Sequence, residues 1–272
     1  LVTQVRLWYH GSACKGTLMH SVLLPPRTVL VRKSMIKVEG RSGCAASAFW
    51  AFEVVRTSLN TKVARTNRQM IVLLEAIGGP PMVAALIALA QQHEKDLLSC
   101  ATPPIPRPII RKLAEHDMND LEKAEREGEL EPVAPTHELL TAGFQPLQEP
   151  YLHQKIGQIV ASQIKKLRDG QFPLSESAFA YGVPDPSGTL QPGTVCLVQD
   201  GLQYIDTEAL LYRHPGIHPG DVRRVRAVPP PKELLAHLEG ADPERASAII
   251  FPTRGGRSLA DEMSGGDLDG DE

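Results

Sequence analysis

Residues 248–271 read Ala-Ile-Ile-Phe-Pro-Thr-Arg-Gly-Gly-Arg-Ser-Leu-Ala-Asp-Glu-Met-Ser-Gly-Gly-Asp-Leu-Asp-Gly-Asp. The first four predict a short apolar strand, which ends at a proline and a glycine-bearing turn. Asp267, Asp269 and Asp271 follow at alternate positions, so they share one face of a strand or converge in a tight loop. Three close carboxylates repel one another unless a cation neutralises them. Ligands that are all oxygen favour Mg²⁺ or Ca²⁺, and Gly265–Gly266 leaves room for close approach by a triphosphate.

Two other interpretations of this aspartate loop stay open on these residues alone. An EF-hand loop has a glycine after its third acid and a glutamate six positions beyond that glycine. Here Gly270 precedes the third acid, so the EF-hand pattern does not match. A calcium-binding structural module of another kind remains compatible with the carboxylates, and so does an acidic surface turn without a metal.

The sequence upstream of the loop predicts short strands with Gly and Pro turns, a pattern typical of a barrel. One helix, at about 231–238, interrupts them. The strands are expected at 178–182, 194–199, 209–213, 222–228 and 248–251.

The first 170 residues predict strands followed by helices. Short strands are expected within 4–38, at 5–9 and 28–31, with Lys15–Gly16 and Pro25–Pro26 as the turns. Apolar residues at helical spacing begin at about Asn60. Their helix is stopped by 78–81, Gly-Gly-Pro-Pro, and a second apolar helix runs over 82–98. An amphipathic helix is expected over 151–169, with Gly170 as the residue that ends it.

These changes of pattern divide the chain into five parts. They are a barrel-like part at 1–40, a helical connector at 41–98, a Pro-rich and acidic linker at 99–150, an amphipathic helix at 151–177, and a second barrel-like part at 178–272. Because the chain starts without a methionine and stops at the acidic loop, we expect it to be an interior piece, truncated at both ends.

Composition excludes few classes of protein. The hydrophobic content of 42% predicts a globular chain. No uninterrupted run of about 18 apolar residues occurs, so no membrane-spanning helix is expected. The four cysteines lack metal-site spacing, which favours free thiols in a reducing, intracellular compartment; nucleus and cytoplasm are not distinguished. The net charge is -3, but residues 1–70 carry eleven Lys and Arg against two acids. Such asymmetry indicates either a phosphate-facing surface or a solvated face.

Several motifs follow one another along the chain. They are Lys15-Gly16-Thr17, Arg32-Lys33-Ser34-Met35-Ile36-Lys37, Asn67 to Gly78, Tyr181 to Gly193, His218-Pro219-Gly220-Asp221, Ile250-Phe251-Pro252 and Gly266 to Asp271. Their order closely resembles the cellular RNA-dependent RNA polymerases of RNA silencing. That family carries a His-Pro-Gly-Asp stretch, an apolar strand ending in Phe-Pro, a glycine-bearing turn and a Gly-Asp-x-Asp-Gly-Asp loop. The resemblance covers nearly the whole chain except about 99–150.

The resemblance implies an α+β fold with parts of two double-psi β-barrels joined by helices. The end of the first barrel would lie at 1–40, a variable insertion or linker at 99–150, and an incomplete second, catalytic barrel at 178–272. It implies an RNA-directed RNA polymerase, a nucleotidyltransferase that makes double-stranded RNA for RNA silencing from nucleoside triphosphates on a single-stranded RNA template. The implied cofactor is Mg²⁺, with Mn²⁺ as an alternative ion. Partners would be RNA, NTPs and RNA-silencing proteins, with no membrane. A catalytically inactive RNA-binding fragment is the main alternative.

The resemblance also implies roles for individual residues. The three aspartates would hold the metal, and Lys15 would lie near the nucleotide phosphates or the primer end. Arg213, His218 and Asp221 would shape a turn of the barrel, with a catalytic His218 as the alternative. Tyr181, Trp8 and Tyr9 could stack on bases, although core packing is the simpler interpretation. The catalytic set is Asp267, Asp269, Asp271 and Lys15, and the RNA- or NTP-binding set is Arg32, Lys33, Lys37, Arg257 and Arg213.

Overall fold

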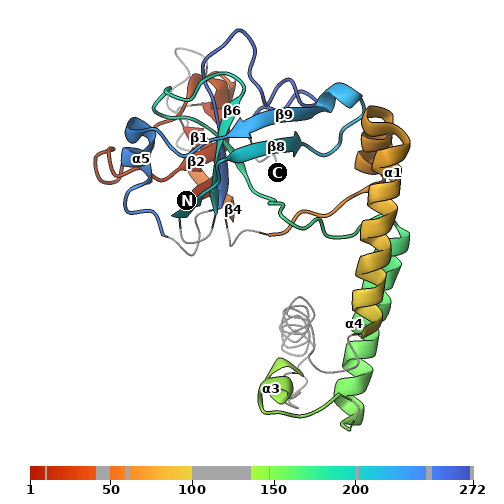
Figure 1. The fold of residues 1–272 in the computed structure, drawn as a ribbon. Helices are drawn as coiled ribbons and strands as arrows, with labels where there is room; N and C mark the ends of the chain where they lie inside the picture. Colours follow the sequence, from red (N-terminus) through yellow and green to blue (C-terminus); the bar gives the residue numbers. More distant parts are fainter. Residues whose placement is uncertain are drawn as a thin grey trace. The chain divides into compact units, whose positions relative to one another are not determined.

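The computed structural model describes residues 1–9, 11–40, 50–58, 62–99, 136–146, 148–199, 202–242 and 247–269 (Figure 1). The fold is α+β, with one antiparallel sheet and one mixed sheet. The chain forms two compact units. Unit 1 combines residues 1–64 with 174–272, and unit 2 is residues 65–173.

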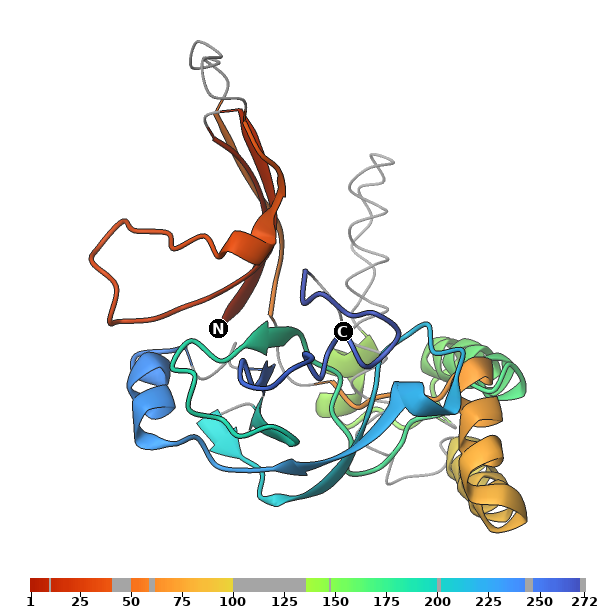
Figure 2. The same ribbon diagram turned by 90° about the horizontal axis from the view of Figure 1, so that it is seen from above.

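The first sheet of unit 1 has the strand order β3-β2-β1-β4. Its central hairpin pairs Val5 with Gly16 and Arg6 with Lys15. A loop over residues 20–32 leaves the sheet and returns at the short helix η1 (Figure 2). The elements are β1 (Val2–Tyr9), β2 (Ser12–Met19), η1 (Lys33–Met35), β3 (Ile36–Val38) and β4 (Ala51–Thr57).

The second sheet of unit 1 has the order β5-β10-β6-β9-β8, with β7 paired to β6. It is mixed, because β10 runs parallel to β5 and β6 runs parallel to β9. Helix α5 lies in the same unit. The elements are β5 (Gly182–Pro184), β6 (Thr194–Gln199), β7 (Gln203–Tyr204), β8 (Thr207–Tyr212), η4 (Pro219–Asp221), β9 (Val222–Ala227), α5 (Lys232–Leu238) and β10 (Ala248–Phe251).

Two apolar clusters form the core of unit 1. The first joins Val2 of the first sheet to residues of β6, β10 and α5, all nearly or fully buried. The second lies beneath the segment that leads to the aspartate loop, and Leu268 packs against it. The aspartate loop is therefore attached to a well-packed part of the unit. The second cluster consists of Val195, Val225, Ala227, Phe251, Leu259, Ala260 and Met263.

The turn that follows β5, over residues 185–190, is closed by a buried carboxylate. Asp185 is 3% exposed, and its two oxygens accept hydrogen bonds from the amides of Ser187, Thr189 and Leu190. These bonds satisfy backbone donors that would otherwise lie unpaired near the core. The motif at 181–190 thus contains strand β5 and a structural turn.

Unit 2 contains the helices α1 (Arg68–Leu98), α3 (Thr136–Thr141) and α4 (Pro150–Arg168). Asn67 caps α1, and its side chain accepts a hydrogen bond from the Met70 amide at 2.8 Å. Gly79 has φ 60 and ψ -157 and, with two prolines after it, breaks α1 at the position where a stop was expected. The buried face of α4 packs with Leu97, and Gly170 follows with φ 75.

Several expectations about strands were wrong. Lys15–Gly16 is not a turn but the middle of β2, where Gly16 gives room to the Met35 side chain. Residues 28–31 form no strand, because a β-branched run without a partner strand gains no ladder hydrogen bonds. The strand expected at 178–182 begins at Gly182. The expected helical connector also holds a strand, β4, of the first sheet.

By length and composition alone, α1 could cross a membrane. It is the one helix of this kind within the described ranges. This differs from the expectation, because residues 76–93 carry no charge although Gly, Pro and Gln interrupt the apolar run. One helix of this kind is weak evidence for a span. Of the cysteines, Cys14 and Cys196 are buried thiols. Cys44, Cys100 and the acidic segment 111–131 lie outside the described residues.

Candidate active site at the aspartate loop

Leu268 fixes the conformation of the aspartate loop between Asp267 and Asp269. Its φ is 54, in the left-handed region that a branched side chain rarely adopts. The side chain packs against the second core cluster of unit 1 and against Gly182. A Cβ at Gly182 would lie 2.6 Å from the Leu268 Cδ2 atom, so any larger residue there would displace the Leu268 side chain. Packing on both sides thus holds a strained residue between the two aspartates.

Side chains of the first sheet hold the backbone of the same loop. The Thr17 hydroxyl is fully buried and donates to the Leu268 carbonyl at 2.9 Å, with the Gly182 carbonyl at 3.3 Å. The Gln4 amide donates to the Asp269 carbonyl at 2.9 Å. Gln4 belongs to none of the sequence motifs, and Thr17 carries a signal only as part of the Lys-Gly-Thr motif, which by itself predicts no role for the hydroxyl.

Two lysines of the first sheet neutralise the two described aspartates. The Nζ atom of Lys15 lies 2.5 Å from the Asp269 carboxylate, and that of Lys37 lies 2.9 Å from the Asp267 carboxylate. Burial raises the pKa of Asp267, but the hydrogen bond and charge of Lys37, followed by the Asp269 carboxyl and Lys15, outweigh it and lower that pKa below its usual value. Asp267 is therefore ionised at neutral pH.

The donor chemistry of this loop fits a hard divalent cation. Asp267 and Asp269 offer only oxygen, lie close enough to interact, and already require positive charge beside them. Asp271, the third expected ligand, lies outside the described residues. Among the residues that the structure describes, no three His, Cys, Asp or Glu side chains form a metal-binding group. Asp267 and Asp269 are thus the two expected ligands that belong to the described residues.

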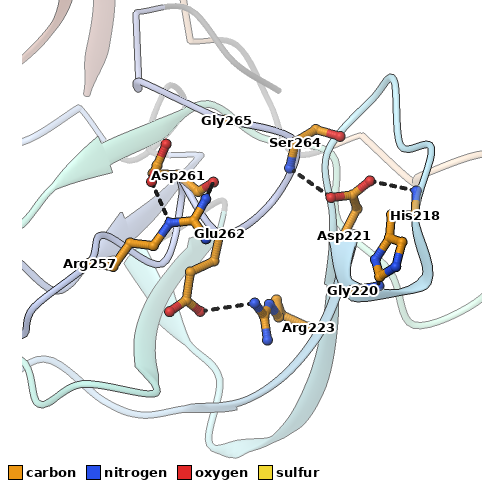
Figure 3. A pocket seen from close by; sticks show the side chains of 9 residues that line it. All are labelled: His218, Gly220, Asp221, Arg223, Arg257, Asp261, Glu262, Ser264 and Gly265. Atoms are coloured by element: carbon orange, nitrogen blue, oxygen red, sulfur yellow. Dashed lines mark hydrogen bonds and ion pairs between the residues drawn. The ribbon is translucent and has the colours of Figure 1, made fainter.

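A second set of contacts positions the segment just before the aspartates. The Asp221 carboxylate accepts a hydrogen bond from the Ile217 amide. It also accepts one from the His218 amide and, on its other side, one from the Ser264 amide at 3.0 Å (Figure 3). Arg213 donates to the Ser264 carbonyl at 2.9 Å. The amide and the carbonyl of Ser264 are therefore both hydrogen-bonded to the β8–β9 connection. Ser264 lies three residues before Asp267.

Replacement of Asp221 by Asn should loosen this connection in a pH-dependent way. The Ile217 amide, with burial acting in the opposite direction and the His218 and Ser264 amides adding to it, lowers the pKa of Asp221 to about 2. A lowered pKa stabilises the fold above about pH 4, and this contribution is lost as pH falls towards 2. We expect D221N to cost about 2 kcal/mol at pH 7 and much less at pH 3, measured by denaturant unfolding.

D206N is the matched control for this stability experiment, because Asp206 is an exposed carboxylate that pairs with Arg226. It should change stability by less than about 1 kcal/mol. Equal costs for D221N at pH 7 and pH 3 would contradict the assigned cause.

Loss of the Thr17 hydroxyl should also act on the loop. In T17V the shape is nearly kept, but the Leu268 carbonyl loses its donor in a buried place, at a cost of about 1–3 kcal/mol. T17S keeps the donor and should retain most of the stability. Thermal or denaturant unfolding checks the order wild type, T17S, T17V. If T17V were as stable as T17S, the hydrogen bond to Leu268 would be unimportant.

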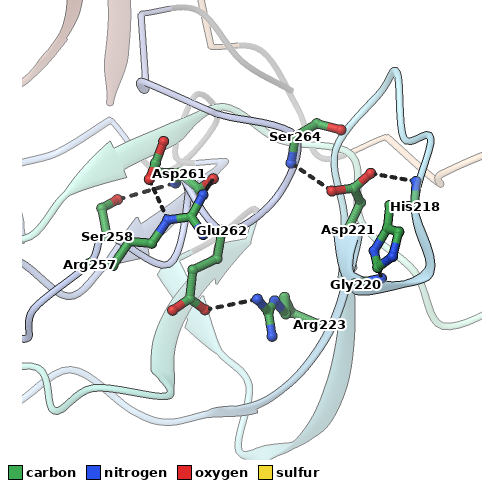
Figure 4. Close-up of polar contacts among 9 residues, drawn as sticks. All are labelled: His218, Gly220, Asp221, Arg223, Arg257, Ser258, Asp261, Glu262 and Ser264. Atoms are coloured by element: carbon green, nitrogen blue, oxygen red, sulfur yellow. Dashed lines mark hydrogen bonds and ion pairs between the residues drawn. The ribbon is translucent and has the colours of Figure 1, made fainter.

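A pocket of about 350 Å³ lies beside this segment but is not the aspartate site. Two ion pairs line it, Arg257 with Asp261 at 2.5 Å and Arg223 with Glu262 at 3.4 Å (Figure 4). Each arginine that lines the pocket is paired with a carboxylate that also lines it. The other lining residues are His218, Gly220, Asp221, Ser264 and Gly265.

The remaining predicted site residues are spread more widely. Arg32 donates to the Thr17 carbonyl at 3.0 Å. Burial lowers the pKa of the Arg32 guanidinium. Arg257 binds Asp261 in the pocket. Lys33 is exposed on η1, and no contact in the described part of the chain joins it to the aspartates. The structure thus brings Lys15 and Lys37 to Asp267 and Asp269.

The predicted stacking aromatics divide between core and surface. Tyr181 is 8% exposed and belongs to the core of unit 1, as core packing predicts. Trp8 is 37% exposed and Tyr9 is 47% exposed, so core packing was wrong for these two. Tyr9 meets Trp50 edge to face, with ring centroids 5.7 Å apart. His218 caps η4 through its own ring nitrogen.

Comparisons with known proteins agree on one family. The family described as RNA dependent RNA polymerase matches residues 1–272, the whole chain. The chain belongs to the RNA-dependent RNA polymerase family. It is 34% identical to the "Probable RNA-dependent RNA polymerase 3" of Arabidopsis thaliana over 272 residues, which are 100% of this chain and 25% of that protein. It is 30% identical to the protein of the same description in rice, over 100% of this chain and 24% of that protein.

A solved structure shows the same fold. The "RNA dependent RNA polymerase QDE-1 from Thielavia terrestris" superposes with a TM-score of 0.70 at 24% identity, over 98% of this chain and 30% of that one. The chain spans about a quarter of the length of the two plant relatives. The family confirms the expectation drawn from the ordered motifs.

Proposed function

We propose that the polypeptide containing this chain synthesises RNA complementary to an RNA template, and that unit 1 carries its reaction centre. The observation that carries the proposal is the convergence of Lys15 and Lys37 of the first sheet on Asp269 and Asp267 of the loop. Metal-assisted phosphoryl transfer requires carboxylates that hold a divalent cation and basic side chains that contact the phosphates. The product would be double-stranded RNA that serves RNA silencing.

Each of these residues has a proposed task. A divalent cation, Mg²⁺ or alternatively Mn²⁺, held by Asp267, Asp269 and Asp271 would activate the 3′-hydroxyl and neutralise charge on the triphosphate as pyrophosphate leaves. Lys15 and Lys37 are half-exposed, so their ion pairs exchange partners at little cost. They would release the carboxylates and contact the phosphates of the nucleotide or the primer end. Arg32, Arg213 and Asp221 hold the backbone around the loop.

For the fold, we propose that the two sheets of unit 1 are parts of two double-psi β-barrels. The support is the family membership and the two sheets, with mixed strand directions in the second. The proposed partners are single-stranded RNA, nucleoside triphosphates and proteins of RNA silencing. Arg257 and Lys33 remain proposed RNA or nucleotide contacts on their charge alone.

The test is template-directed incorporation of labelled nucleoside triphosphates by the full-length polypeptide that contains this chain, on single-stranded RNA with Mg²⁺. We expect a product whose length follows the template and which is absent when Mg²⁺ is replaced by Ca²⁺. RNA binding without any product would favour the inactive RNA-binding alternative. Neither binding nor product, together with tight Ca²⁺ binding, would favour the calcium module.

A further inference from the structure

One face of the first sheet continues from the aspartate loop as a polar and then aromatic surface. Successive residues of a strand alternate between faces, so residues two apart share a face. Gln4 and Thr17 are cross-strand partners on this face, and both bind the backbone of the loop. Arg6 and Lys15 form the next pair on the same face, and Trp8 with Ala13 forms the pair beyond.

The side chains of this row are buried next to the loop and exposed beyond it. Thr17 is fully buried, whereas Lys15, Arg6 and Trp8 are exposed residues. Lys15 reaches Asp269, and Arg6 lies directly across the hairpin from Lys15. Trp8 stands one step of about 6–7 Å further along β1. Next to Lys15, which contacts Asp269, this face therefore presents an exposed cation, Arg6, and then an exposed indole, Trp8.

The partner of Arg6 leaves it available for an anion. Arg6 pairs with Glu53 of β4 at 3.3 Å, and both side chains are about half exposed. Pairs of this kind contribute little and are screened by salt, so a phosphate can take the place of Glu53. Within the described part of unit 1, Trp8 belongs to neither apolar cluster. A large aromatic side chain beside a cation, on an open face, is the combination that binds single-stranded nucleic acid.

We propose that the Arg6–Trp8 row of β1 is a contact surface for the RNA strand whose 3′ end lies at the aspartates. Arg6 contacts a backbone phosphate close to that end, and the Trp8 indole stacks on a nearby base. This inference rests on the proposed function, because it takes the aspartate loop as the place where the strand ends. It adds a binding surface that is sequence-independent, since every base offers a ring face.

The experiment uses the full-length polypeptide and a fluorescent primer–template RNA. We expect R6Q to weaken binding several-fold at 0.15 M salt and to reduce the slope of log K against log salt concentration by about 0.7, the value for one lost single-strand phosphate contact. W8L, which keeps an apolar side chain, should weaken binding about five-fold or more, with no change of slope. W8F should restore part of the affinity.

R224Q is the matched control, because Arg224 forms a similarly exposed ion pair with Glu208, on the second sheet. It removes the same charge and should leave both affinity and slope unchanged. Thermal unfolding of the four variants should agree with the wild type, since all three side chains are exposed. A 4-thiouridine placed within a few nucleotides of the primer 3′ end should cross-link to β1.

The outcomes separate this inference from the proposed function. If the wild type elongates the primer while R6Q and W8L bind RNA as R224Q does, the surface is wrong and the polymerase proposal stands. Cross-links from the primer probe that are confined to segments other than β1 would also overturn the surface. If the wild type neither binds nor elongates RNA, both proposals fall together.

Discussion

D269N is expected to reduce nucleotide incorporation by about 10³-fold or more while RNA binding is kept. Asp269 is the less exposed of the two described aspartates, with 15% of its side chain exposed, and it faces Lys15 at 2.5 Å. The amide has nearly the same shape but no charge, so it is a poor ligand for a hard cation. Loss of several kcal/mol of charge stabilisation in the transition state corresponds to this factor.

The measurement is the initial rate of incorporation by the full-length polypeptide at saturating template, with RNA affinity measured in parallel. D206N, which removes an exposed carboxylate that pairs with Arg226 on the second sheet, is the control and should keep the wild-type rate. A D269N rate within ten-fold of the wild type would show that Asp269 is not at the reaction centre.

G266A is expected to lower the rate by about 10²-fold although it adds a single methyl group and no charge. A Cβ at Gly266 would lie 2.7 Å from the carbonyl oxygen of Ala260 and 3.1 Å from Cδ of Arg213. The carbonyl belongs to the backbone, so the segment before Asp267 must move. A displacement of about 1 Å at a reacting group can cost this factor.

G256A is the matched control in the same segment. A Cβ at Gly256 would meet no atom within 4 Å, and its φ lies outside the positive range. We therefore expect G256A to keep both rate and stability. Unfolding curves of the two variants separate a displaced loop from an unfolded protein. Equal rates for G266A and G256A would show that the loop tolerates the shift.

Local pattern predicted many of the elements well. Strands at 194–199 and 248–251 and the helix at 151–169 were expected within one residue of their bounds. The break of α1 at Gly79 followed from Gly-Gly-Pro-Pro. These features depend on side-chain periodicity and on the backbone preferences of Gly and Pro, which neighbours in sequence decide.

Local pattern failed where strand pairing decides the outcome. Lys15–Gly16 was expected to be a turn, but β1 on one side and Met35 on the other make it the middle of a strand. Residues 28–31 have strand composition but no strand. The exposure of Trp8 and Tyr9 was likewise not visible from their apolar character. Each of these results depends on what lies across the chain rather than along it.

By itself, the sequence determined the family and the residues of the aspartate loop, because ordered motifs and carboxylates at i, i+2 and i+4 are written in the chain. Only the tertiary structure decided which side chains surround the loop. Thr17 and Leu268 are 251 positions apart, and Asp221 and Ser264 are 43 apart, yet each pair shares a hydrogen bond. Contacts across such distances form when strands pair and an apolar core closes, and no local periodicity encodes that geometry.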